Sequence, residues 1–259
     1  MIVAGVDGSI PSRAAVDWAA ADALRMHEPL LLVHALDRSP YQISKFPDAG
    51  HSDSVLRAGQ RALNEAVALV HERQPSVEVT TQVVEGTPAP VLCDQGRTAA
   101  ELVIGSRGHG ALTGVLLGSV STHVAGQAAC PVVVVRGDRR PRHGQVVVGV
   151  DDSPASRPAL AYAFAQASLR GSGLLAVHDR QRGVIELLET CKKEYPQVTV
   201  IEQLGGAHPA ETLAEMSERA DLLVVGSHGR GAVGSALAGS VSRDVLHRAR
   251  CAVAVVRGT

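Results

Sequence analysis

The sequence predicts an α/β protein made of two tandem doubly wound domains, each with a five-stranded parallel sheet and helices on both faces. Three observations lead to this prediction. Short valine-rich runs alternate with longer segments of helical period, as in a parallel sheet covered by helices. The same series of elements occurs twice along the chain. The 259 residues are enough for two domains of about 100 to 150 residues, each with its own core.

In the first half, the valine-rich runs predict five strands and the segments between them predict four helices. The strands are expected near residues 2–7, 30–36, 77–84, 101–106 and 131–136. The helices are expected near residues 12–27, 53–74, 88–99 and 119–129. Ser9, Thr87 and Ser119 are expected to begin three of these helices, because serine and threonine are favoured helix caps.

The second half repeats this series with a deletion. Its strands are expected near residues 145–151, 173–178, 197–204, 221–227 and 252–256. Matching residues lie 144 positions apart up to His34, but 121 positions apart from Pro75 onward, so the second half lacks 23 residues between these points. Residues 182–194 then leave room only for a shorter second helix. We expect domains at residues 1–137 and 145–259, the second with a shortened connection after its second strand.

A glycine and serine signature, Gly-x2-Gly-x9-Gly-Ser, follows the fourth strand of each half. Its residues are Gly105, Gly108, Gly118 and Ser119 in the first copy, and Gly226, Gly229, Gly239 and Ser240 in the second. Glycines let backbone N–H groups face a ligand, and a helix N-terminus adds free donors and partial positive charge. This arrangement predicts a phosphate-binding loop. The alternative is a tight strand-to-helix loop with a serine cap, which two copies of one spacing make less favoured.

Two further pairs of residues are expected to meet the glycine loops, because ligands of doubly wound sheets lie beyond the carboxyl ends of the strands. Asp7 and Asp151 end the first strands and could bind a ribose hydroxyl, an adenine amino group or a metal held by phosphates. Each aspartate could instead cap the following turn. Val33 and Val177 end the second strands and could form an apolar wall for a base, or plain core.

Composition and missing motifs narrow the classes of function. The net charge of −1 gives no footprint for nucleic acid, and no apolar run is long enough to span a membrane, so a cytoplasmic protein is expected. Four scattered cysteines predict neither a zinc site nor disulfides, and Cys130 and Cys251 are expected to be buried. The chain has no GxxxxGK[ST] loop, and its three lysines lie far from both glycine signatures, so no catalytic residue is assigned.

The last strand of each half would be an exposed apolar edge if it ended a sheet. These strands are Val132–Val135 and Ala252–Val256. Because an exposed edge favours pairing with another strand, we expect the two to pair with each other or with another chain, and a homodimer is one possible result.

The paired glycine signatures, the Gly-Val-Asp-x-Ser starts and the Cys-Pro-Val-Val-Val-Val-Arg and Cys-Ala-Val-Ala-Val-Val-Arg ends resemble those of universal stress proteins in the tandem two-domain form. The resemblance implies a universal stress protein-like, adenine nucleotide alpha hydrolase-like fold, and membership of the ATP-binding branch. It implies that the signature residues, Asp7, Val33, Asp151 and Val177 surround ATP, which we expect to carry Mg²⁺. Such proteins act as stress-response regulators. The alternatives are a slow ATPase or nucleotide-transferring enzyme, or a scaffold without nucleotide.

Overall fold

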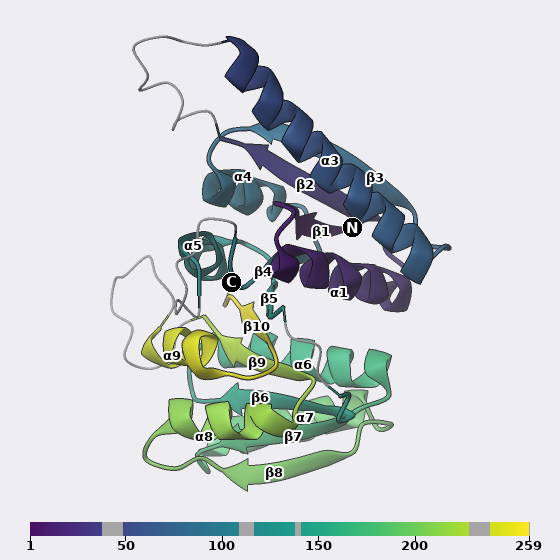
Figure 1. Cartoon of the computed structure of the whole chain (residues 1–259). Helices are drawn as coiled ribbons and strands as arrows, with labels where there is room; N and C mark the ends of the chain where they lie inside the picture. The colour runs from purple at the N-terminus through teal and green to yellow at the C-terminus, as the bar shows by residue number, and fades with distance from the viewer. Residues whose placement is uncertain (38–48, 109–116, 138–140, 228–238, 259) are drawn as a thin grey trace. The chain divides into compact units, whose positions relative to one another are not determined.

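The computed structural model describes residues 1–37, 49–108, 117–137, 141–227 and 239–258, with residues 49–53 described by their backbone alone (Figure 1). The chain divides into two compact units. The first comprises Met1–Val124, Ala128–Cys130 and Val135–Asp138, and the second comprises Ala125–Gln127, Pro131–Val134 and Arg139–Thr259.

The first unit is a doubly wound parallel sheet with strand order β3-β2-β1-β4. Helices α1 and α3 pack against each other on one face, and α4 packs on the other (Figure 1). The direction of winding reverses between β1 and β4, which pair in parallel. Its elements are β1 (Ile2–Gly5), α1 (Ile10–Met26), β2 (Leu30–Leu36), α3 (Ala49–Arg73), β3 (Val79–Glu85), α4 (Pro88–Gln95), β4 (Glu101–Gly105) and α5 (Ser119–Gln127).

Five strands of the second unit repeat this winding in the order β10-β9-β6-β7-β8, and these five are parallel to one another. Helix α6 packs against α7, and α8 packs against α9. Its elements are β6 (Gln145–Val150), α6 (Ser156–Arg170), β7 (Gly173–His178), α7 (Arg182–Glu194), β8 (Val200–Leu204), α8 (Pro209–Met216), a 3-10 turn (Ser217–Arg219), β9 (Leu222–Gly226), α9 (Ser240–Arg248) and β10 (Ala252–Val256). The predicted α/β fold is confirmed.

Strand β5 (Val132–Val135) pairs antiparallel with β10, so the last strands of the two repeats pair as expected. In the register, Val134 lies opposite Val253 and Val132 lies opposite Val255. Residues Pro131–Val134 belong to the second unit, although the sequence repeat assigns them to the first half. Strand β10 therefore has a neighbour on each side, β9 and β5.

The ends of the helices show which expected caps are used. Ser9 caps α1, and its Oγ accepts the Ser12 N–H. Thr87 is the N-cap of α4. Helix α5 begins at Ser119 as expected, but Ser119 is its first helical residue and the N-cap is Gly118, so the serine does not cap the helix. Gly118 has the extended backbone of an N-cap, and its N–H donates to Ser106 O over 2.8 Å.

The deletion in the second half shortens the helix between its second and third strands, as predicted. Helix α3 has 25 residues, whereas α7 has 13. On β8, Ile201 is 56% exposed and Leu204 is 51% exposed. The central strands are buried in both units, and Cys130 and Cys251 are buried beside them as free thiols, as expected.

Candidate functional site

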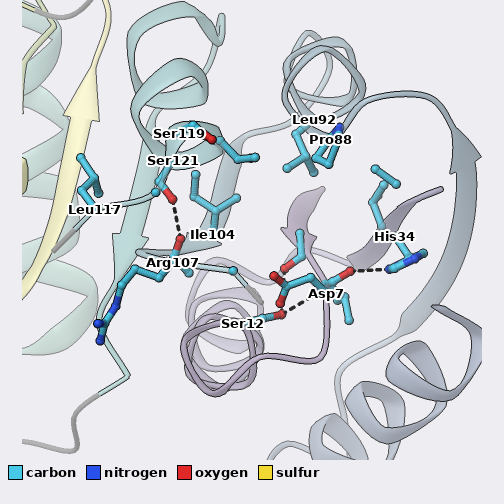
Figure 2. A pocket seen from close by; sticks show the side chains of 18 residues that line it. Asp7, Ser12, His34, Pro88, Leu92, Ile104, Arg107, Leu117, Ser119 and Ser121 are labelled. Carbon is cyan, nitrogen blue, oxygen red and sulfur yellow. Dashed lines mark hydrogen bonds between the residues drawn. The ribbon is translucent and has the colours of Figure 1, made fainter. Parts of the chain in front are cut away.

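A cavity of about 500 Å³ lies in the first unit, where the winding of the sheet reverses (Figure 2). This volume lies in the range typical of small-molecule sites. All six residues that the sequence analysis singled out in the first half line it: Asp7, Val33, Gly105, Gly108, Gly118 and Ser119. They come from β1, β2, β4 and α5 or from the loops that follow these strands. The fold thus brings together residues that are up to 112 positions apart in the sequence.

Asp7 lies just beyond the end of β1, and its backbone and side chain are held by the start of α1. Its N–H donates to Ser12 Oγ over 3.1 Å, and its Oδ1 accepts the Ser9 N–H over 2.9 Å. The latter bond is the aspartate turn that the sequence analysis gave as the alternative role. The half-buried carboxylate also lines the cavity. Both roles therefore fit the same side chain.

The three signature glycines differ in what an added side chain would meet. A Cβ atom on Gly105 would lie 2.7 Å from the backbone carbon of Pro11, so this glycine allows β4 to pack closely against the start of α1. A Cβ atom on Gly108 would lie 2.6 Å from Asp7 Oδ2. On Gly118 the nearest atom of the described residues would be 3.6 Å away, an ordinary contact. Protein packing therefore explains Gly105 and Gly108 but leaves Gly118 unexplained.

The N-terminus of α5 faces the cavity with unused donors. Within the described part of the chain, the backbone N–H groups of Ser119, Val120 and Ser121 have no acceptor, and the first α5 N–H to find one is that of Thr122. Helix α5 has no side-chain cap, and Ser119 is exposed. Ser121 Oγ turns back to Gly105 O over 2.8 Å. The loop thus offers backbone donors and a free end of a helix dipole, a combination that suits an anion.

Apolar side chains form another part of the cavity wall. They come from β2, α4, β4 and the loop before α5: Val33, Ala35, Pro88, Leu92, Ile104 and Leu117. In Figure 2, Pro88 and Leu92 lie on one side of the pocket, with Ser119 and Ser121 on α5 and with Asp7 and His34 on other sides. The cavity is therefore apolar on one part of its wall and offers hydrogen-bond donors and a carboxylate on others.

Several lining residues were missed by sequence reasoning, namely Ser12, His34 and Ser121. His34 Nδ1 lies 2.8 Å from Val6 O, and Ser9 Oγ donates to Arg107 O over 3.3 Å. The sequence holds one signal that could have found two of them, because His34 and Ser12 recur as His178 and Ser156 at the same offset as Asp7 and Asp151. No such repeat in the sequence indicates the backbone carbonyls, Val6 O and Arg107 O, that these side chains contact.

Comparison with known proteins decides the family. The profile of the Universal stress protein family matches residues 1–136 and 143–257. The chain belongs to this family. Universal stress protein Rv2005c of Mycobacterium tuberculosis is 36% identical over 287 residues, which cover 99% of this chain and 96% of the relative. A universal stress protein of Mycolicibacterium smegmatis is 36% identical over 286 residues, with the same coverage of both chains.

A solved structure shows the same fold over the whole chain. The crystal structure of a universal stress protein from Archaeoglobus fulgidus superposes with a TM-score of 0.79 and covers 99% of this chain and 96% of its own. The sequences are 20% identical, so this likeness speaks to the fold of the universal stress protein domains.

The second universal stress protein domain places its predicted residues in the same order. Asp151 follows β6, Val177 lies in β7, Gly226 ends β9, and Gly239 caps α9 just before Ser240. Gly229 lies outside the described residues. A Cβ atom on Gly226 would lie 2.9 Å from Cβ of Ala155, so this glycine permits close packing as Gly105 does.

The aspartates of the two domains differ in their hydrogen bonds. Ser156 Oγ donates to Asp151 Oδ1 over 2.8 Å, and the Ser153 N–H donates to the same oxygen. In the first domain the matching Ser12 Oγ donates to Gly5 O instead. The Asp151 carboxylate therefore has one more protein hydrogen bond from this serine than Asp7 has.

A chain of polar groups joins the end of β7 and the middle of β8 to α7 in the second domain. His178 Nε2 lies 3.2 Å from Glu202 Oε2, and Lys192 Nζ donates to Glu202 Oε1 over 2.6 Å and to Glu189 over 2.8 Å. The hydrogen bond from Lys192 is the main cause that lowers the pKa of Glu202, although partial desolvation opposes it. The hydrogen bond to Glu189 is the main cause that raises the pKa of Lys192.

The described residues contain no group of three or more histidine, cysteine, aspartate or glutamate side chains that could hold a metal ion. Among the same residues, no helix is both long enough and apolar enough to cross a membrane.

Proposed function

We propose that the protein is an ATP-binding regulator of the universal stress type, and that the cavity of its first domain binds ATP with Mg²⁺. The observation that carries this proposal is the meeting of all six predicted residues around one cavity of about 500 Å³. The cavity combines an apolar wall with free backbone donors, as a ligand with a base and phosphates requires.

The residues present fit such a ligand. The free N–H groups at the start of α5 suit the phosphates, and Gly118 leaves open the space that a side chain would fill. The wall that includes Val33, Pro88 and Leu92 suits a base. Asp7 remains for a ribose hydroxyl, an adenine amino group or the magnesium ion. Bound Mg²⁺ would offset the charge of the phosphates.

Binding rather than catalysis is the proposed activity. Among the described residues that line the cavity there is no lysine, and Arg107 is the only arginine. Little positive charge is therefore available to stabilise the transition state of a rapid phosphoryl transfer. His34 Nδ1 is already engaged with Val6 O. A ligand that differs in affinity between two states of the protein can shift its partner choice or assembly, which is what a regulator requires.

The second domain is proposed to hold a weaker nucleotide site, formed by Asp151, Val177, Gly226, Gly229, Gly239 and Ser240. Two features support the lower affinity. Helix α7 is shorter than α3, and Asp151 is already bonded to Ser156 Oγ. A ligand that uses this carboxylate competes with the serine hydroxyl.

Counting the nucleotide that co-purifies with the protein tests the proposal. Freshly purified protein is denatured, and the released nucleotide is identified and counted per chain, followed by titration of the emptied protein with ATP and Mg²⁺. Gly118→Val and Gly239→Val serve as a matched pair, each directed at one domain. We expect Gly118→Val to remove the tighter binding and Gly239→Val to leave it. No nucleotide and no uptake of ATP would refute the proposal and favour a scaffold.

A further inference from the structure

His34 is held on two sides at the edge of the cavity. Its Nδ1 lies 2.8 Å from Val6 O, and because a carbonyl oxygen only accepts, Nδ1 is the protonated nitrogen. The Val6 N–H donates to Val33 O over 2.8 Å. The backbone N–H and the carbonyl of Val6, the residue directly before Asp7, are thus hydrogen-bonded to Val33 and His34, respectively.

The other side of the ring meets helix α3 at a buried glycine. A Cβ atom on Gly59 would lie 2.4 Å from His34 Cδ2 and 2.5 Å from Nε2, so any side chain there would displace the ring. Glycine destabilises a helix interior relative to alanine, yet α3 has a glycine where it contacts the His34 ring. No described residue of α3 lines the cavity, so Gly59 reaches it only through His34.

The second domain lacks this contact. Counting back from the matching Pro75 and Pro196, the first residue of α7, Arg182, corresponds to Arg61, so no helical residue matches Gly59. His178 is the counterpart of His34. Its Nε2 is hydrogen-bonded to Glu202 Oε2, and its buried Nδ1 has no hydrogen-bond partner within the described residues. The contact between histidine and glycine is therefore a feature of the first domain.

We propose that His34 is a positioning residue of the nucleotide site, and that Gly59 holds it in place, so that α3 sets the nucleotide affinity without touching the ligand. This inference rests on the proposed binding of ATP in the first cavity. The ring fixes the Val6 carbonyl, and with it the direction in which the chain carries Asp7 toward the cavity. Movement of α3 away from the sheet would release the ring and weaken the site.

Calorimetric titration with Mg·ATP tests this on the full chain and on single and double variants. Gly59→Ala is expected to bind about tenfold more weakly than the unmodified protein, because the displaced ring no longer holds Val6. His34→Ala is expected to weaken binding to a similar extent. His34→Asn keeps a donor for Val6 O and is expected to restore most of the affinity. Gln60→Ala, at an exposed neighbouring position of α3, is the matched control and should bind as the unmodified protein does.

The double variant Gly59→Ala/His34→Ala separates coupling from general damage. Removal of the ring leaves room for the new methyl group, so the double variant should bind no more weakly than His34→Ala alone. Thermal unfolding of each variant shows that it is folded, and the two His34 variants test the proposal even if Gly59→Ala does not fold.

The outcomes distinguish this inference from the proposed function. If the unmodified protein binds Mg·ATP but Gly59→Ala or His34→Ala binds equally well, the role of His34 and Gly59 is refuted and the proposed function stands. Additive losses in the double variant, or failure of His34→Asn to restore binding, would also overturn it. If the unmodified protein does not bind Mg·ATP, both proposals fall.

Discussion

Asp7 Oδ2 lies 2.6 Å from the point where a side chain on Gly108 would begin. The two residues are about a hundred positions apart, and they belong to the loops that follow β1 and β4. Because β1 and β4 are adjacent parallel strands, these loops leave the sheet at the same edge. The second signature glycine is thus in contact with the carboxylate of Asp7, just beyond the end of β1.

Gly108→Ala is expected to weaken nucleotide binding by about tenfold or more while changing the free energy of unfolding by less than about 1 kcal/mol. The reason is that the new Cβ atom meets the tip of the Asp7 side chain, which can turn away, but only by leaving its place at the cavity. Calorimetric titration with Mg·ATP and thermal unfolding measure the two effects. Unchanged affinity would show that Asp7 does not contribute to binding.

Gly105→Ala is expected to destabilise the fold by about 1–3 kcal/mol, the usual cost of overpacking. Its Cβ atom would meet backbone atoms of Pro11 and Ser12 at 2.7–2.8 Å, and backbone cannot turn aside as a side chain can. Gly118→Ala is the matched control, because among the described residues its Cβ atom would have no contact closer than 3.6 Å, and it should cost less than about 1 kcal/mol. Denaturant unfolding of both variants checks the order, and equal losses would contradict the packing role of Gly105.

Glu202→Gln is expected to lower the stability of the second domain in a pH-dependent way. The pKa of Glu202 is lowered from 4.5 in the folded state, chiefly by Lys192, so this carboxylate stabilises the fold above that pH. The stabilisation is lost as the pH falls below 4.5 through the lowered folded value. Because Glu202 is partly exposed, the effect at pH 7 should be below about 1 kcal/mol.

Thermal unfolding from pH 3 to pH 8 measures this difference between Glu202→Gln and the unmodified protein. The difference should be largest above pH 5 and should shrink in acid. Arg182→Gln, at an exposed ion pair with Glu186, is a control for the loss of a surface pair on α7, the helix that carries Lys192. A difference independent of pH would show that Glu202 contributes through packing alone.

Cys130 is expected to react far more slowly than Cys93 with iodoacetamide at pH 8. Burial raises the pKa of the Cys130 thiol to about 11, so little of the reactive thiolate forms at pH 8, whereas Cys93 is only half-buried. Mass spectrometry after a short labelling pulse gives the modified fraction of each residue. Equal labelling of the two would contradict the buried environment of Cys130.

Much of the fold and the cavity was predictable because the relevant pattern lies in the chain itself. Valine-rich runs mark the strands, and the carboxyl ends of parallel strands meet wherever the winding reverses, which brings Asp7 and Gly105 to one cavity. The shortening of α7 was predictable from the change in offset between the repeats. These inferences need only period, spacing and topology.

Other features depend on atomic contacts that no spacing reveals. Ser119 was expected to cap α5, but the extended backbone of Gly118 takes that position. The closeness of Gly105 to Pro11 follows from how tightly α1 packs on β4. The role of His34 was missed because its partners are a backbone carbonyl and a glycine, which carry no side-chain signal.

The pairing of β5 with β10 means that the boundary between the sequence repeats is a poor place to divide the chain. A shortened protein that begins at residue 143 would lose the strand that lies against β10. The freed border, Ala252–Val256, is buried and entirely apolar, and its unpaired amide and carbonyl groups would attract any other extended chain. The second repeat, produced alone, would then be prone to self-association. The strand that the first repeat contributes, β5, therefore protects the edge of the second repeat against pairing with other chains.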